Sequence, residues 1–137
     1  MTRALLQPMI DQGRGDIVMI ASMAGVNPSV MAGSVYSAAK TAARVYMNVL
    51  AQEVRAFGIR SITVSPGEVD TPIMDNRPLV PDTETRARMM QPEDISAAVL
   101  MAVSLPRRAM VSEINIGATD PRDMSADIAA SKNKQTA

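Results

Sequence analysis

The stretch Ile17-Val18-Met19-Ile20-Ala21-Ser22 decides the fold of this 137-residue chain. Its first four residues are apolar, include β-branched side chains and follow glycines, which is typical of a short strand buried on both faces of a parallel sheet. Apolar residues at helical spacing over residues 2–12 predict a helix before this strand, kinked by Pro8. A run without glycine or proline from about Val35 to Phe57 predicts a long helix after it.

The remaining elements continue this alternation. Residues 60–65 predict a second strand, which Pro66-Gly67 ends, and residues 112–116 alternate as a third strand. Between them, a proline at the first helical position and two acids in the first turn predict a helix over residues 91–105. Alternating helices and strands connect through right-handed crossovers, so the sequence predicts an α/β fold with three parallel strands and three helices.

Composition excludes several classes of function. Lys and Arg (14) balance Asp and Glu (14), so the chain lacks the positive surplus that binds nucleic acids or anionic membranes. It contains no His and no Cys, which excludes imidazole catalysis, thiolate nucleophiles, disulfides and Cys/His metal sites. The sequence has neither a run typical of a membrane span nor a signal-peptide pattern, so we expect a cytoplasmic protein without a metal site.

The acid or base of any reaction must therefore be Tyr, Lys or a carboxylate. Tyr36 and Lys40 lie four residues apart, so one face of the predicted helix presents both side chains. An ammonium beside a phenol favours the phenolate, and such a pair can supply a general acid or base. Ser22 follows the first strand and Pro66-Gly67 the second. Because the carboxyl ends of parallel strands meet at one edge of a sheet, we expect these residues to line one crevice.

These residues belong to a longer pattern. Over about residues 1–119 the chain resembles the C-terminal half of the short-chain dehydrogenase/reductase family. The matching segments follow the family order: IASMAG (20–25), YSAAK (36–40), SPGEVDTP (65–72), QPEDI (91–95) and EINI (113–116). The resemblance implies a Rossmann-like, doubly wound parallel sheet, of which this sequence contains the C-terminal portion.

The resemblance also implies roles for the site residues. The serine matching Ser22 orients the substrate oxygen, the tyrosine matching Tyr36 exchanges the proton, and the lysine matching Lys40 stabilises the tyrosinate and binds the nicotinamide ribose. Four further positions after the second strand contact the nicotinamide: Pro66, Gly67, Val69 and Thr71. The implied cofactor is NAD or NADP, with a slight preference for NADP, and the implied substrates are small alcohols and carbonyl compounds.

The sequence also departs from the family. It has no G-x-x-x-G-x-G or G-x-G-x-x-G turn, which cradles the pyrophosphate at a helix N-terminus in the family. We therefore expect the N-terminal dinucleotide-binding half to be absent, residues 1–119 to form the catalytic and substrate-loop half, and residues 120–137 to form a polar, disordered tail. The first strand would be an exposed edge, and we expect the isolated chain to be marginally stable and to have little activity.

Two segments of the sequence lead to predictions about substrate binding and about assembly. Residues 66–91 are long for a connection and predict a mobile loop over the site. Within them, residues 77–90 contain Met, Leu and Val and are expected to shape a substrate pocket that tolerates apolar groups. Apolar residues spread around the 35–57 helix, which in the family packs against its symmetry mate, so we expect a homodimer or homotetramer.

Two functions remain open at this point. The first is an NAD(P)-dependent oxidoreductase that interconverts an alcohol and a ketone or aldehyde through Ser22, Tyr36 and Lys40. The alternative is a non-catalytic fragment of the family that acts as a dimerisation or structural module. Titration with NADH and NADPH would separate the two.

Overall fold

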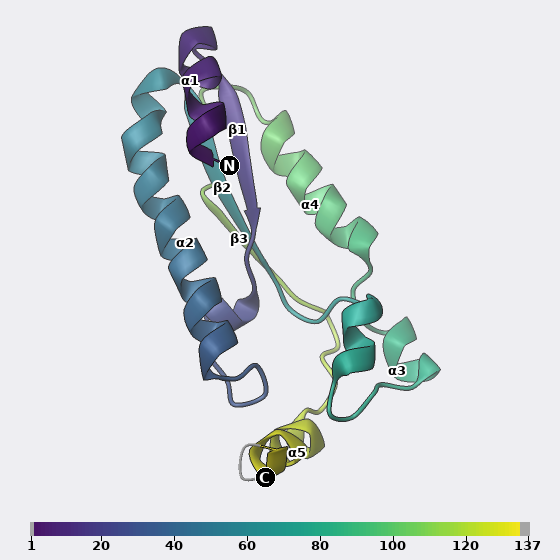
Figure 1. Ribbon diagram of the computed structural model, residues 1–137. Helices are drawn as coiled ribbons and strands as arrows, with labels where there is room; N and C mark the ends of the chain where they lie inside the picture. The colour runs from purple at the N-terminus through teal and green to yellow at the C-terminus, as the bar shows by residue number, and fades with distance from the viewer. Residues whose placement is uncertain (1, 135–137) are drawn as a thin grey trace.

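The computed structural model describes residues 2–134, and within this range three parallel strands form one sheet (Figure 1). β2 (Ile59–Pro66) lies between β1 (Gly15–Ile20) and β3 (Glu113–Ile116). Every residue of β2 is buried, whereas most of β1, at the edge of the sheet, is half-buried. The predicted parallel α/β fold is confirmed, and β1 is an edge strand among the residues described.

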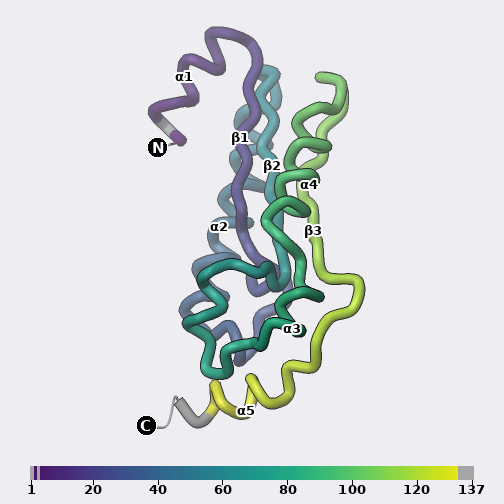
Figure 2. The backbone as a smooth tube through the Cα atoms, turned by 90° about the vertical axis from the view of Figure 1, so that its right-hand side faces the viewer, coloured from purple at the N-terminus to yellow at the C-terminus, as the bar shows by residue number. Residues whose placement is uncertain are grey.

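Helices cover both faces of this sheet, as the two views in Figures 1 and 2 show. α1 (Thr2–Gln12) and α2 (Ser34–Val54) pack on one face, where Met47 and Leu50 form a core with Ile59. α4 (Pro92–Ser104) packs on the other face, where Ala102 contacts Ile62 and Val64. Because successive strand residues point to opposite faces, β2 contributes to both cores.

Both long helices begin and end close to the predicted positions. α2 continues as a 3-10 turn, η2 (Arg55–Phe57), and Gly58 follows with a φ of 71°, in the left-handed region that favours glycine. α4 begins with Pro92 at its first position and a capping box between Gln91 and Asp94. The capping box satisfies N–H groups that a helix start leaves without an intrahelical partner.

A buried arginine joins the amino end of the sheet to the end of α4. Arg60 is 4% exposed, and its guanidinium donates to the carbonyls of Val103, Leu105 and Ala109 at 2.7, 3.0 and 3.1 Å. It also pairs with Asp16 of β1 at 2.6 Å. Burial tends to raise the pKa of Asp16, but the hydrogen bond from Arg60 and nearby arginine charges outweigh it and lower that pKa. Arg60 thus satisfies carbonyls that the helix end leaves unpaired.

The segment predicted as a mobile loop contains two short helical elements, η3 (Pro72–Asn76) and α3 (Thr83–Ala87). Residues 69 and 90, at its two ends, pair as an isolated parallel bridge. Arg86 of α3 connects this segment internally, because its guanidinium pairs with Asp70 at 3.2 Å and also with Asp75 of η3. These partners lie 16 and 11 residues from Arg86, so helical or strand periodicity does not reveal them.

The prediction of a disordered tail was wrong for the residues up to 134. They include α5 (Ser125–Lys134), in which Asp127 is only 2% exposed. Arg122 accounts for this order, since it pairs with Asp127 at 2.7 Å and with Glu68, on the connection after β2, at 2.8 Å. Polar composition favours disorder because such a segment buries little apolar surface, but here hydrogen bonds between charged side chains attach the segment to the rest of the fold. Residues 135–137 of the predicted tail lie outside the described residues.

Candidate functional site

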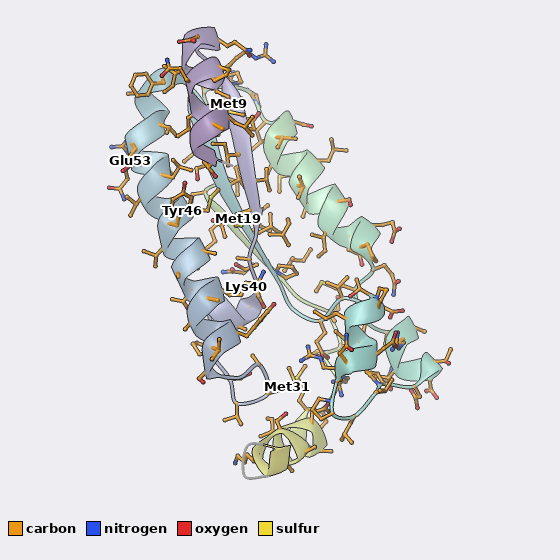
Figure 3. All side chains as sticks on the ribbon, viewed as in Figure 1. Met9, Met19, Met31, Lys40, Tyr46 and Glu53 are labelled. Carbon is orange, nitrogen blue, oxygen red and sulfur yellow. The ribbon has the colours of Figure 1, made fainter. Side chains whose placement is uncertain are left out.

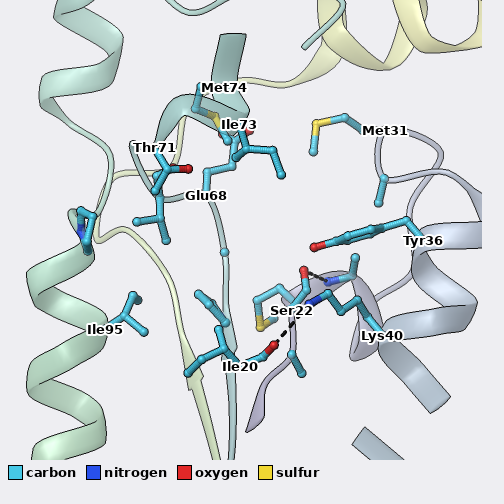
Figure 4. Close-up of a pocket in the computed structure, with 18 of the residues that line it drawn as sticks. Ile20, Ser22, Met31, Tyr36, Lys40, Glu68, Thr71, Ile73, Met74 and Ile95 are labelled. Carbon is cyan, nitrogen blue, oxygen red and sulfur yellow. Dashed lines mark hydrogen bonds between the residues drawn. The ribbon is translucent and has the colours of Figure 1, made fainter. Parts of the chain in front are cut away.

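A cavity of about 990 Å³ opens at the carboxyl edge of the sheet (Figure 4). The end of β1, the first turns of α2, the connection after β2 and one side of α4 surround it. The structure brings together in this cavity all seven residues selected from the sequence: Ser22, Tyr36, Lys40, Pro66, Gly67, Val69 and Thr71. Its size is ample for a cofactor fragment and a small substrate.

Ser22 leaves β1 in an extended conformation and caps the short 3-10 turn η1 (Met23–Gly25). Its Oγ accepts a hydrogen bond from the backbone N–H of Ala24 at 3.1 Å. A hydroxyl has one donor and two acceptor sites, so this bond leaves the Ser22 O–H free to donate to a ligand oxygen. Figure 4 shows the hydroxyl groups of Ser22 and Tyr36 pointing toward one another.

Tyr36 and Lys40 lie on successive turns near the start of α2. The Nζ of Lys40 donates to the carbonyl of Ile20, the last residue of β1, at 3.2 Å, and lies 5.6 Å from the centre of the Tyr36 ring. This bond uses one of three ammonium hydrogens and leaves two for a ligand. Tyr36 is 42% exposed, so its phenol is accessible from the cavity.

Gly25 lets the turn that holds Ser22 pack directly on the backbone of α2. A β-carbon at Gly25 would lie 2.7 Å from the carbonyl carbon of Lys40 and 2.8 Å from its oxygen, closer than such atoms approach. The Gly25 carbonyl also accepts a hydrogen bond from the Thr41 hydroxyl at 3.3 Å. This backbone contact therefore sets the distance between Ser22 and Lys40. The sequence motif contains Gly25, but only the structure shows what it contacts.

The residues that follow β2 form a second side of the cavity. Gly67 donates its N–H to the carbonyl of Ile116 on β3 at 2.8 Å, which continues the sheet beyond Pro66. Pro66 has no N–H and ends the strand, where the chain leaves the sheet. The hydroxyl of Thr71 faces the carbonyl of Val69. This side thus offers backbone groups and one hydroxyl beside apolar surface.

Apolar side chains line the part of the cavity beyond the Tyr36 hydroxyl. Met31 comes from the loop before α2, whereas Ile73 and Met74 come from η3 (Figure 4). Met124, just before α5, lines the same cavity. The C-terminal segment, expected to be a disordered tail, therefore contributes a side chain to the candidate site.

The expectation that residues 77–90 shape this cavity was wrong for most of that segment. The residues of this connection that line the cavity lie earlier, within 71–77, because η3 turns back over the edge of the sheet. Thr85, Arg88 and Met89 instead line an adjoining cavity of about 290 Å³, which shares Gly67, Glu68 and Met124 with the first.

Glu68 is the centre of the charges at the cavity. Its side chain is 11% exposed and lies between Arg122 at 2.8 Å and Arg77 at 3.6 Å. Hydrogen bonds from Arg122 to the carboxylates of Glu68 and Asp127 stabilise the charged guanidinium and raise the pKa of Arg122. No spacing rule could have revealed this network, because Arg122 lies 54 residues from Glu68.

The groups in the cavity fit the nicotinamide end of a dinucleotide. Lys40 has ammonium hydrogens for ribose hydroxyls, and the surface from Pro66 to Thr71 combines apolar area with polar groups suited to a carboxamide-bearing ring. Among residues 2–134, no cluster of three or more His, Cys, Asp or Glu side chains could hold a metal ion. The helices of this described range are too short or too polar to span a membrane.

Comparison with known proteins points to one family. A model of the short chain dehydrogenase family matches residues 1–79. An uncharacterized oxidoreductase of Staphylococcus aureus strain MRSA252 is 32% identical over 114 residues, which cover 83% of this chain and 47% of that protein. The chain thus spans about half the length of the curated relatives it matches.

Solved structures share the architecture. The closed form of a serine dehydrogenase complexed with NADP+ matches with a TM-score of 0.75 at 25% identity, covering 90% of this chain and 52% of that one. A 3-oxoacyl-[acyl-carrier protein] reductase from Brucella melitensis with bound NAD matches with a TM-score of 0.65 at 26% identity, covering 83% and 44%.

Proposed function

The chain belongs to the short chain dehydrogenase family, and on that premise we propose that it carries the catalytic and substrate-binding part of an NAD(P)-dependent oxidoreductase. The reaction is the interconversion of an alcohol and a ketone or aldehyde. The observation that carries the proposal is the meeting of Ser22, Tyr36 and Lys40 in one cavity at the carboxyl edge of the sheet. Similar structures contain NADP+ or NAD, which supports either nucleotide as the cofactor.

Three side chains have different roles in the transfer of the proton. In carbonyl reduction, the Ser22 O–H donates a hydrogen bond to the carbonyl oxygen, and the Tyr36 phenol transfers its proton to that oxygen. In alcohol oxidation, the Tyr36 phenolate removes the proton of the substrate hydroxyl. The Lys40 ammonium, 5.6 Å from the ring centre, stabilises the charge of that phenolate.

The cofactor would lie against the residues that leave β2. A bound nicotinamide supplies or accepts the hydride at the substrate carbon. Lys40 would bind the ribose hydroxyls with the hydrogens that Ile20 does not use. The nicotinamide ring and its carboxamide would contact four residues that share one side of the cavity: Pro66, Gly67, Val69 and Thr71.

Turnover is best measured on two polypeptides, the chain itself and the chain fused behind the nucleotide-binding half of the Staphylococcus aureus relative. We expect the fusion to reduce simple ketones with NADPH or NADH, and the chain alone to have little activity. In the fusion, Tyr36→Phe removes the transferable proton and should lower turnover by at least about 100-fold. Tyr46→Phe is the matched control, because Tyr46 lies farther along α2 (Figure 3) and does not line the cavity.

Equal turnover by the two variants would refute the role of Tyr36. If the chain leaves the nicotinamide fluorescence of NADH and NADPH unchanged and the fusion does not reduce ketones, the alternative of a non-catalytic structural module would be preferred.

Assembly through α2 is part of the same proposal. Apolar residues of this helix that remain 47–52% exposed, counting its 3-10 extension, support a helix-to-helix contact between copies: Val45, Tyr46, Val49 and Phe57. Light scattering at micromolar concentration should then give the mass of a dimer or tetramer, and a monomeric mass would contradict it.

A further inference from the structure

We propose that Arg77 determines substrate specificity at this site, and that the substrate is a hydroxy acid or oxo acid. Arg77 binds the carboxylate of this substrate while the reacting oxygen lies at Ser22 and Tyr36. The inference rests on the proposed function, because it concerns a second group on the molecule that Tyr36 protonates or deprotonates. Its support comes from the unused donors of Arg77, the charges around the cavity and the place of Arg77 on η3.

Arg77 differs from the other arginines of the fold that are buried or half-buried. Among the side chains that the structure describes, the others all donate hydrogen bonds to a carboxylate: Arg44, Arg60, Arg86 and Arg122. Within the same part of the chain, the Nε–H of Arg77 is buried and has no acceptor. A buried donor without an acceptor is unfavourable and rare in folded proteins. On a residue that lines a cavity, it points to an acceptor that a ligand supplies.

Glu68, the acid nearest to Arg77, hydrogen-bonds to another arginine. Its two carboxylate oxygens accept from Arg122 at 2.8 and 3.1 Å. An Nη of Arg77 lies 3.6 Å from Glu68, which is close enough for charge attraction but too long for a hydrogen bond. A substrate carboxylate can therefore offer Arg77 two short, charge-assisted hydrogen bonds that Glu68 does not provide, while Arg122 continues to neutralise Glu68.

The charges that line the cavity favour one bound anion. Within residues 2–134, two cations and one anion line it: Lys40, Arg77 and Glu68. Lys40 is bound to the Ile20 carbonyl and stands beside Tyr36, where the proposed mechanism uses its charge. A single carboxylate at Arg77 would balance the remaining positive charge. Apolar neighbours such as Ile73 and Met74 reduce screening by water, which strengthens this attraction.

The backbone around Arg77 holds its side chain at the cavity. Arg77 ends η3, and its backbone N–H donates to the carbonyl of Met74 at 3.2 Å. Met74 is only 2% exposed, so the core anchors this turn. The Arg77 side chain is 24% exposed and lines the same cavity as Tyr36. Because folding has already removed most of this side chain from water, carboxylate binding requires little further desolvation of the arginine.

Pairs of ligands that differ in charge test the proposal directly. 3-Hydroxybutanoate, 4-hydroxypentanoate and 5-hydroxyhexanoate place a carboxylate at increasing distance from a secondary alcohol, and the amide of each has nearly the same shape without the charge. Binding to the chain, without cofactor, is followed by NMR of 15N-labelled arginine side chains. We expect at least one acid to shift the Arg77 Nε–H signal, to leave that of Arg60 unchanged, and to bind at least about tenfold more tightly than its amide.

Three variants separate hydrogen bonding from charge and from position. Arg77→Gln should lower the affinity for the best acid at least about tenfold and leave that for its amide unchanged. Arg77→Lys keeps the charge without the planar pair of donors and should lower it about threefold. Arg88→Gln is the matched control, because Arg88 also lies 3.6 Å from an acid, Asp120, but lines only the adjoining cavity. Its effect should stay below about twofold, and an unchanged Arg60 signal shows that each variant is folded.

Three results on the chain would overturn the proposal: no acid that binds more tightly than its amide, an Arg77 signal that no acid shifts, or a folded Arg77→Gln chain that keeps its affinity for the acid. The fusion adds a fourth. There, Arg77→Gln should leave the Kd of NADPH unchanged, whereas equal losses for NADPH and the acid would assign Arg77 to the phosphates of the cofactor.

These results are separate from the fate of the proposed function. Binding of an acid through Arg77 without any hydride transfer in the fusion would refute the proposed function alone. Turnover of uncharged secondary alcohols in preference to hydroxy acids would refute the role of Arg77 alone.

Discussion

The two sides of the cavity are held in place by different interactions. The Ser22 corner, residues 20–41, depends on main-chain contacts: Gly25 packs on the backbone at Lys40, and the Ile20 carbonyl binds the Lys40 ammonium. The ion-paired cover, residues 67–90 and 120–134, depends on arginines that join distant acids, with Arg86 and Arg122 as its centres. The groups proposed for proton transfer lie on the first side, and the apolar side chains of Ile73, Met74 and Met124 lie on the second.

The two kinds of interaction respond differently to solution conditions. A close backbone contact has a short, steep distance dependence and involves no titratable group, so the contact at Gly25 does not depend on salt or pH. Ion pairs between partly exposed groups contribute less and respond to both salt and pH. We therefore expect the ion-paired cover to respond to salt and pH more than the Ser22 corner does.

The largest effect is expected from Gly25→Ala in the Ser22 corner. The added β-carbon would lie 2.7 Å from the carbonyl carbon of Lys40, a backbone atom that cannot rotate away. We expect a loss of about 3 kcal/mol in the free energy of unfolding, the upper end of the usual range for overpacking, measured by urea denaturation. Gly117→Ala is the matched control, because a β-carbon there meets nothing within 4 Å. Equal losses in both variants would contradict the contact.

A smaller and more local effect is expected from Asp127→Asn in the ion-paired cover. Asp127 is buried and pairs with Arg122 at 2.7 Å, so the change weakens the attachment of α5. Hydrogen exchange should show a loss of about 2 kcal/mol in the protection of α5, with α2 unaffected. Asp120→Asn is the control, since that side chain is 79% exposed and should cost little. A loss of protection that extends equally to α2 would show that the cover is not a separate unit.

The smallest effect on stability is expected when the pH is lowered. This effect should appear in the ion-paired cover and not in the Ser22 corner. Hydrogen bonds from Thr85 lower the pKa of Asp82, and those from Ser125 lower the pKa of Asp123, both from an ordinary value of 3.8. Because the folded-state pKa is lowered, the stabilisation is present above 3.8 and is lost as the pH falls through the folded value.

Amide NMR between about pH 5 and pH 2 should therefore show transitions at Thr85 and Ser125 with midpoints below 3.8, and none at the start of α2, where Gly33 provides no side-chain cap. Asp82→Asn should remove the transition at Thr85 and leave that at Ser125. Midpoints at or above the ordinary value would contradict the capping bonds.

Sequence patterns predicted the elements that local chemistry determines. A short β-branched run flanked by glycine predicted β1, and Pro92 with two acids predicted the start of α4. The same reasoning selected Ser22, Tyr36 and Lys40, because strand ends and a four-residue helical spacing are properties of nearby residues. Most of this side of the cavity could therefore be assigned before the structure.

The order of the C-terminal segment could not be predicted in that way. Residues 120–134 are polar, and their composition alone favours disorder. Arg122 pairs with a residue 54 positions earlier, and this pairing holds the segment that places Met124 at the cavity. Likewise, residues 71–77 line the cavity because η3 folds back over it, which the composition of the connection does not reveal.

The sequence by itself thus determined the α/β order, the approximate positions of the three strands and of α1, α2 and α4, and the residues proposed for proton transfer, because each depends on neighbours within a few positions. The tertiary structure alone decided three things: the close approach at Gly25, the order of α5, and the pairing of Arg77 and Arg122 with Glu68. Packing distance and charge pairing depend on residues that are far apart in the chain and meet only when the sheet has formed.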